Sequence, residues 1–177
     1  MAEKITILLF LVMGFTSCSV KFEEALNVED STPEFIFQNA NMVRYENRVP
    51  KSELNAEIIE QYKDSTETFA KGVDFKSFNE NGEIDTEGEC GYLFTDTKSE
   101  LYELYDDIKL FSYEQKTNFY ADSLRWNSKS EQMIGGKNDM VRIEKEDTVI
   151  YGSGFSASGV SKTYSFSGSV SGDIETK

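Results

Sequence analysis

Apolar and polar residues alternate along much of the chain, as they do in β-strands that bury one face. In residues 163–171 serine takes every second position from 165 onward, which is the pattern of a half-buried strand. Short β-branched or aromatic runs occur at 35–37, 140–143 and 148–151. Turn-forming residues, such as those at 79–82, separate these runs. The pattern predicts a protein built mainly of short strands.

A five-residue pattern recurs at intervals of about 31 residues. Asp96–Glu100 reads DTKSE, Asn127–Glu131 reads NSKSE, and Ser158 begins a similar stretch the same distance further on. Tyr62–Thr66 fits the same frame with a slip of one or two residues. A period of this size is typical of repeat architectures, in which each unit buries its apolar face against its neighbours.

Two stretches have the apolar spacing of an amphipathic helix instead. They are residues 101–108 and 54–62, where apolar residues recur at intervals of three and four. The repeat frame aligns them with segments such as Met133–Gly136, whose paired glycines do not suit a helix. We therefore predict strands in both places and an all-β fold over 35–177, with a short helix near 100–108 as the main alternative.

Composition excludes several classes of function. The 177 residues include 32 Asp and Glu against 18 Lys and Arg, for a net charge of -14, and no histidine. Phosphate backbones repel so acidic a surface, and catalytic couples or zinc sites that need histidine are impossible. Carboxylate pairs such as Asp106–Asp107 and Glu144/Glu146 are what chance gives on an acidic surface, so we predict no enzyme, no cofactor and no metal site.

The N-terminal residues have the features of an export signal. The apolar run at 5–13 would be about 14 Å long as a helix, much shorter than a membrane core of about 30 Å. Phe15–Cys18 (FTSC) resembles a bacterial lipobox, so we expect residues 1–17 to be removed and Cys18 to be acylated. An ordinary signal peptide with an incidental cysteine is the alternative. Cys90 would then have no disulfide partner, and we interpret it as a packed strand residue.

Residues 18–34 are acidic and weakly periodic, and we interpret them as a tether between the acylated cysteine and the domain at 35–177. The expected location is the periplasm, with a lipid anchor in a membrane. The residues of this segment do not distinguish the inner from the outer membrane; the family resemblance described next favours the inner membrane.

Short motifs in the domain are similar to those of the LptC family. They are a first strand pair at 35–37 and 42–45, the segments Leu54–Ile58 (LNAEI) and Phe119–Leu124 (FYADSL), and a strand that ends in Gly168-Ser169-Val170. LptC is the periplasmic component of the lipopolysaccharide-export ABC transporter and belongs to the OstA-like β-jellyroll group. The familiar members carry a transmembrane helix, whereas this chain has the lipobox-like Cys18.

The resemblance implies an open jellyroll, a V-shaped pair of twisted antiparallel sheets that holds lipid acyl chains between them. It also implies that the protein passes lipopolysaccharide or a related glycolipid from the permeases of an inner-membrane ABC transporter to a downstream periplasmic jellyroll protein. The expected lipid-contacting residues are large or small apolar side chains facing inward: Phe37, Leu54, Ala56, Ile58, Phe75, Phe94, Leu110, Phe119, Ala121, Leu124, Trp126, Ile143, Phe155, Phe166 and Val170. The alternative is that the same side chains form a closed, dry core.

The last strand is expected to be an exposed edge on which a partner can dock. It has no proline or inward charge to block strand pairing. Its residues are Thr163, Tyr164, Ser165, Phe166, Ser167, Gly168, Ser169 and Val170. We expect it to pair with the first strand of the downstream jellyroll, and the strand at 35–37 to meet the transporter's own jellyroll. Alternatively, the domain itself covers this strand.

A different class of function remains open, that of a surface or periplasmic lipoprotein which binds carbohydrate or protein. Its contacts would be exposed aromatic residues, with Trp126 as the first candidate. The exposure of Trp126 distinguishes the two hypotheses.

Overall fold

The computed structural model describes residues 32–62 and 66–174, and all regular structure in these ranges is β-strand. The twelve strands belong to one sheet in which all the pairs are antiparallel. This confirms the all-β fold and the strand interpretation of 54–61 and 101–108. The strands are β1 (Phe35–Glu46), β2 (Val49–Gln61), β3 (Glu67–Phe78), β4 (Ile84–Asp96), β5 (Leu101–Ser112), β6 (Thr117–Asn127), β7 (Gln132–Gly135), β8 (Met140–Lys145), β9 (Thr148–Ser153), β10 (Phe155–Ser158), β11 (Thr163–Phe166) and β12 (Val170–Ile174).

The 31-residue repeat is a recurring hairpin turn. The first residue of each copy caps its own turn: Asp96 accepts a hydrogen bond from the Lys98 amide at 2.9 Å, and Asn127 accepts one from the Ser130 amide at 2.9 Å. Successive turns are also joined, because the Ser128 amide donates to the Glu100 carbonyl at 3.0 Å. The repeat therefore marks every second hairpin, and these hairpins lie at the same end of the strands. The copy at 62–66 lies partly outside the described residues.

The long strands β1 to β6 bend in the middle. Backbone φ is positive at Asn39 in β1, Gly72 in β3, and Asp106 and Asp107 in β5, and the register skips these positions. The register is the same on both sides of Asn39 and of Gly72, whereas it shifts at Asp106–Asp107, where the extra residue is a β-bulge. At Gly72 the φ of +61° is one that favours glycine. These interruptions of strand pairing line up across the sheet as a crease, which we define by Asn39, Glu57, Gly72, Gly91 and Asp106.

The crease divides the sheet into two walls, so the expected pair of sheets is one folded sheet. Strand β6 shows the division most clearly, because Asn118–Tyr120 pair with β8 whereas Leu124–Asn127 pair with β7. Wall A contains 40–46, 49–56, 73–78, 84–90, 108–112 and 117–121, with β8, β9 and β12. Wall B contains 35–38, 58–61, 67–71, 92–96, 101–105 and 123–127, with β7, β10 and β11.

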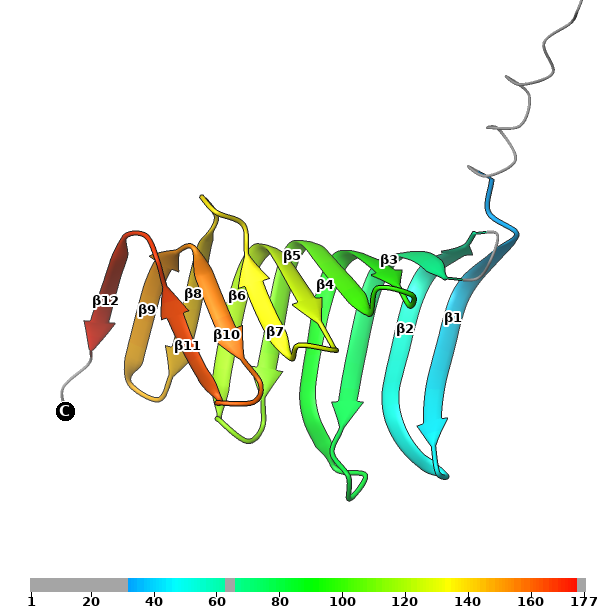
Figure 1. Ribbon diagram of the computed structural model, residues 1–177, viewed down its shortest axis with the longest axis horizontal. Coiled ribbons are helices and arrows are strands. Elements are labelled where there is room, and N and C mark those ends of the chain that lie inside the picture. Colours follow the sequence, from blue (N-terminus) through cyan, green and yellow to red (C-terminus); the bar gives the residue numbers. More distant parts are fainter. Residues whose placement is uncertain (1–31, 63–65, 175–177) are drawn as a thin grey trace, which may run out of the picture. The chain divides into compact units, whose positions relative to one another are not determined.

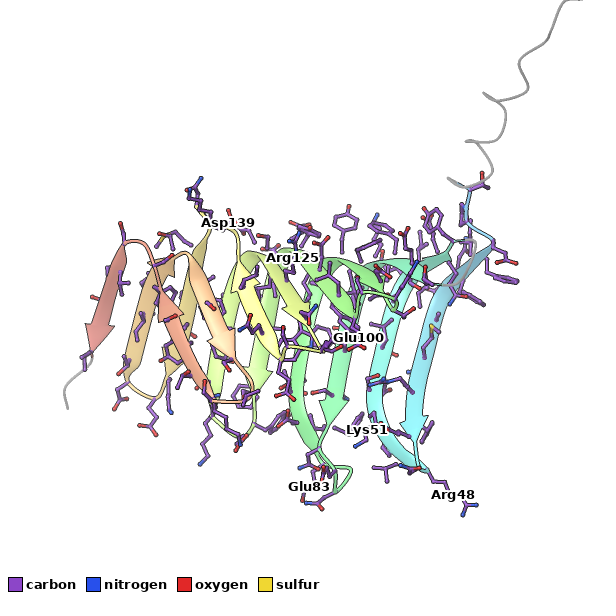
Figure 2. All side chains as sticks on the ribbon, viewed as in Figure 1. Arg48, Lys51, Glu83, Glu100, Arg125 and Asp139 are labelled. Carbon is purple, nitrogen blue, oxygen red and sulfur yellow. The ribbon has the colours of Figure 1, made fainter. Side chains whose placement is uncertain are left out.

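Short strands continue both walls beyond β6. Figure 1 shows β7, β10 and β11 in front of β8 and β9, and the chain passes between the two groups three times. In Figure 2, Arg48 and Glu83 mark hairpin turns at the outer end of wall A, at the bottom of the view. Asp139 marks the connection between β7 and β8, at the top of the view. Each pair of short strands thus repeats the path of one long, bent strand.

Two predicted strand boundaries are wrong. The first strand pair at 35–37 and 42–45 is the single strand β1, bent at Asn39. The last strand is divided into β11 in wall B and β12 in wall A. Residues 167–169 connect β11 to β12. They are hydrogen-bonded to the junction of β9 and β10, since the Ser167 amide donates to the Gly154 carbonyl and the Ser153 amide donates to the Ser169 carbonyl, both at 3.1 Å. The serine alternation continues through this change of wall, so the sequence pattern did not reveal it.

We expect Ile59→Ala to destabilise the protein far more than Ile58→Ala. Ile59 is fully buried on the side of the sheet that faces the other wall, whereas Ile58 is half-buried on the opposite side. Truncating a buried isoleucine typically lowers the free energy of unfolding by about 2–5 kcal/mol, and a half-buried one by about 1 kcal/mol. Denaturant unfolding of the two variants measures the difference. Equal losses would contradict this assignment of faces.

Candidate functional site

The two walls share an inner face that is almost entirely apolar. Residues directly opposite each other in antiparallel strands point to the same side, so the register assigns each residue to a face. Ile59 lies opposite Phe37 and Ala70, and Ile143 lies opposite Phe119 and Ile150. Across the described residues the only buried polar side chain is that of Thr117. The inner face is therefore suited to contact apolar groups.

Most of the expected lipid-contacting residues lie on this inner face. They come from both walls and from strands far apart in the sequence. They are Phe37, Leu54, Ala56, Phe75, Leu110, Phe119, Ala121, Leu124, Trp126, Ile143, Phe155, Phe166 and Val170.

Ile58 and Phe94 lie on the outer face instead. Ile58 is opposite Gln38 and Lys71, and Phe94 is opposite Glu103. Both follow the crease, where the alternation of faces shifts by one residue, so the neighbouring Ile59 points inward in place of Ile58. An inward position for either residue was a wrong prediction.

The sequence interpretation missed several inward residues next to the crease. The buried ones are Ile59, Ala70, Val73, Cys90, Leu93, Leu104, Ile108 and Val141, and the exposed ones on β1 include Phe35 and Met42. Inward residues on either side of the crease are three or four positions apart, as in the pairs Ala70/Val73 and Leu104/Ile108. That spacing is the signal that could have found them, and it is the same spacing that resembled a helix.

The inner face is open at the β1 end of the sheet. Phe35 is 52% exposed, Phe37 42% and Met42 42%, although all three side chains point to the side that is buried further along the sheet. Leu54 and Phe75, on the next two strands, are half-buried. This end of the structure therefore presents large apolar side chains to solvent.

Aromatic rings fill the inner face at the other end. The Phe119 ring of wall A lies 6.1 Å from the Phe155 ring and 6.3 Å from the Tyr164 ring, both of wall B. Phe166 lies 5.6 Å from Phe155 and covers Gly152 of wall A so closely that a Cβ atom there would collide with the ring. The two walls are thus in direct contact near β11.

Most charged side chains of the strands lie on the outer faces; Arg44 and Lys145 are inward by register, at the outer ends of wall A strands. Arg125 pairs with Glu103 on wall B, its Nε donating to Glu103 Oε1 at 2.6 Å, and Arg142 pairs with Glu144 on wall A at 2.8 Å. Asp106 and Asp107 are exposed residues of the bulge. In the described ranges no three acidic or cysteine side chains come together as metal ligands.

Trp126 lies on the inner face, half-buried between Tyr102 and Met133 on the neighbouring strands. A carbohydrate- or protein-binding surface centred on this residue would require it to project outward. The position of Trp126 therefore gives no support to a binding module of that kind.

Both ends of the sheet have unpaired edges. Among the described residues, β1 is hydrogen-bonded to β2 alone, β11 to β10 alone and β12 to β9 alone. Nearly all residues of these three strands are exposed. Edges of this kind are templates for pairing with a strand of another protein.

The family described as "Lipopolysaccharide-assembly, LptC-related" matches residues 5–175, nearly the whole chain. The chain belongs to the LptC-related family. This chain is also similar, at 21% identity, to a protein of Treponema pallidum (strain Nichols) named "Uncharacterized protein". The match covers 94% of this chain and 84% of that protein.

Membership of the LptC-related family indicates a part in the periplasmic transport of lipopolysaccharide-type lipids, in an envelope location, as a transport component rather than an enzyme. In the part of the chain that the structure describes, no helix could span a membrane. The predicted signal peptide and Cys18 lie outside the described residues.

Cys90 is a buried thiol on the inner face at the crease. Only 6% of it is exposed, and burial raises its pKa from 9.0 to about 11. Since the thiolate is the reactive form, a nucleophilic role near neutral pH is unfavourable. This agrees with its interpretation as a packed strand residue.

We expect the burial of Cys90 to make the protein less stable in alkali. Between pH 9 and pH 11 the unfolded chain loses the thiol proton while the folded protein retains it. The free energy of unfolding should therefore fall through this window, by up to about 2–3 kcal/mol from this group.

Denaturant unfolding at about pH 8 and about pH 10.5 measures this loss, and Cys90→Ala is the control because it keeps every tyrosine. The loss should be smaller in the variant. The same loss in both proteins would assign the alkaline instability to other groups.

Proposed function

We propose that this protein is an envelope lipoprotein that passes lipopolysaccharide or a related glycolipid from an inner-membrane ABC transporter to a downstream periplasmic jellyroll protein. The observation that carries the proposal is the apolar inner face, which extends from the free edge at β1 to the free edges at β11 and β12 and, in the described strands, has inward charged residues only at its rim, Arg44 and Lys145. Acyl chains would lie on this face, and the polar headgroup would remain in solvent.

The energetics favour acyl chains as the occupant. Each methylene group removed from water contributes roughly 0.8 kcal/mol. The exposed rings of Phe35 and Phe37 and the side chain of Met42 would be covered at the same time. The net charge of -14 gives a reason for headgroup phosphates to stay outside the groove.

The free edges provide the route into and out of the protein. In this proposal β1 pairs with the jellyroll of the transporter permeases, and β11 and β12 pair with the downstream jellyroll. Each junction would join the inner face of this protein to that of its partner. The expected docking residues at 163–170 are then used as two short strands joined at Ser167–Ser169, rather than as one.

Membrane attachment is assigned to the N-terminus. Residues 1–17 act as a signal peptide, Cys18 carries the lipid, and 18–34 link it to the domain. A tether of this length can extend about 50 Å, enough to hold the domain away from an inner-membrane surface.

Phe37→Asp should reduce lipid binding, whereas Ile36→Asp should not. The two residues are adjacent in β1 and similarly exposed, but Phe37 points to the inner face and Ile36 to the outer face. A carboxylate among acyl chains loses its hydration, so it opposes binding. Native mass spectrometry of the full-length protein, gently extracted from its own envelope, measures the bound lipid and gives its mass.

A lipid mass that is present in wild type and Ile36→Asp but lost in Phe37→Asp supports the proposal. No bound lipid in any of the three proteins, with the fold intact by circular dichroism, would refute it. Equal loss in both variants would place the lipid outside the inner face.

Cys18→Ser should release the protein from the membrane. A serine side chain cannot form the thioether to which the lipid is attached, and a protein without acyl chains loses the affinity that anchors it. Wild-type protein should sediment with membranes, and the variant should be found in the soluble fraction of the periplasm. Membrane sedimentation of both proteins would contradict lipidation at Cys18.

A further inference from the structure

The inner face is divided by the aromatic contact between the walls. We define the aromatic plug as Phe119, Phe155, Tyr164 and Phe166. Phe119 belongs to β6 in wall A, and the other three belong to β10 and β11 in wall B. Their ring centroids are 5.6–6.4 Å apart in four contacts. Such distances are those of packed aromatic rings, which leave no room for an acyl chain between them.

The plug reaches from one wall to the backbone of the other. Phe166 lies over Gly152, the residue of β9 that pairs with both Val141 and Val170. Because glycine has no side chain, the ring can approach the wall A backbone directly. Phe155, at the centre of the plug, is only 3% exposed. The inner face is therefore closed at this point.

Apolar surface continues on both sides of the plug. Toward β1, the inward side chains of Phe37 and Met42 are each 42% exposed. Beyond the plug, Val170 is 57% exposed and Ile174 is 71% exposed on β12, at the edge assigned to the downstream partner. The plug thus separates an open apolar surface near β1 from a second one at the opposite edge.

We propose that the aromatic plug divides the groove into an acyl-chain site on β1 to β3 and an exit site on β12, and that it opens to let acyl chains pass. This inference rests on the proposed lipid-carrying function. The acyl-chain site is the inner face at Phe35, Phe37, Met42, Leu54 and Phe75.

The moving part is β11. It has four residues, it is hydrogen-bonded to β10 alone, and it supplies two of the four plug rings. Tyr164 is already 36% exposed. A partner strand that pairs with the free edge of β11 would act directly on the strand that holds Tyr164 and Phe166, so docking and opening would be coupled.

A photo-labelling experiment tests the division. The probe is a monoglycosyl diacylglycerol with a diazirine in one acyl chain, added to the purified full-length protein, and labelled peptides are identified by mass spectrometry. In wild type, label should collect on β1 to β3 and be scarce on β12. In Phe166→Ala and Tyr164→Ala, labelling of β12 should increase several-fold, because the plug loses a ring.

Two further variants control for indirect effects. Phe111→Ala removes a ring from the outer face of wall A, where it packs against Tyr113, and should leave the labelling pattern as in wild type. Gly152→Ala adds a side chain where Phe166 lies and should raise β12 labelling from the opposite wall. Circular dichroism establishes that each variant is folded; Tyr164 is partly exposed, so its truncation is the mildest for the fold.

The outcomes separate this inference from the proposed function. Strong labelling of β12 in wild type, equal to that in the folded plug variants, would overturn the plug while lipid carriage stands. Labelling of β1 to β3 with no increase on β12 in any folded plug variant would also overturn it. No labelling of the inner face in any protein would refute lipid carriage and the plug together.

Discussion

The bend in the long strands is the constraint on which the rest of the structure depends. A straight antiparallel sheet of this length would expose one apolar face to water along its whole extent. The positive φ at Asn39 and Gly72 and the bulge at Asp106–Asp107 fold the sheet so that two halves of the same face come together. Hydrogen bonding is maintained on both sides of the crease, so both walls remain continuous. The groove, its apolar lining and the wall-to-wall ring contacts all follow from this fold line.

Much of the fold could be predicted from local pattern, because strands and turns leave local signals. The turn motifs that begin at Asp96 and Asn127 revealed the repeat, and the alternation of apolar and polar residues predicted the strands. The crease could not be located, since only Gly72 among its φ-positive positions is a glycine, and the others are Asn and Asp, common throughout the chain. In every long strand except β5 the crease shifts each later residue to the opposite face. This is why Ile59 replaces Ile58 on the inner face.

The distribution of charge explains how so acidic a chain can have an apolar groove. The acidic residues of the described strands lie on outer faces, at the crease or in turns, where water solvates them. Several carry a cationic partner, as in the pairs Glu103–Arg125 and Glu144–Arg142. On wall B, desolvation and a hydrogen bond to Glu103 raise the pKa of Tyr105. Water therefore solvates the acidic outer face, while inward charge is confined to the rim of the inner face, at Arg44 and Lys145.

The number of times the chain passes between the walls sets the direction in which the first and last strands of the sheet run. Six long strands and three pairs of short ones make nine passes, an odd number, so β1 and the pair β11/β12 both run from wall B to wall A. A second copy stacked in the same orientation would have to place its β1 parallel to β11 and β12, against the antiparallel pairing of the whole sheet. Parallel pairing is the slightly weaker arrangement. A partner whose first strand runs the other way forms the better junction, so strand parity disfavours head-to-tail stacking of identical copies.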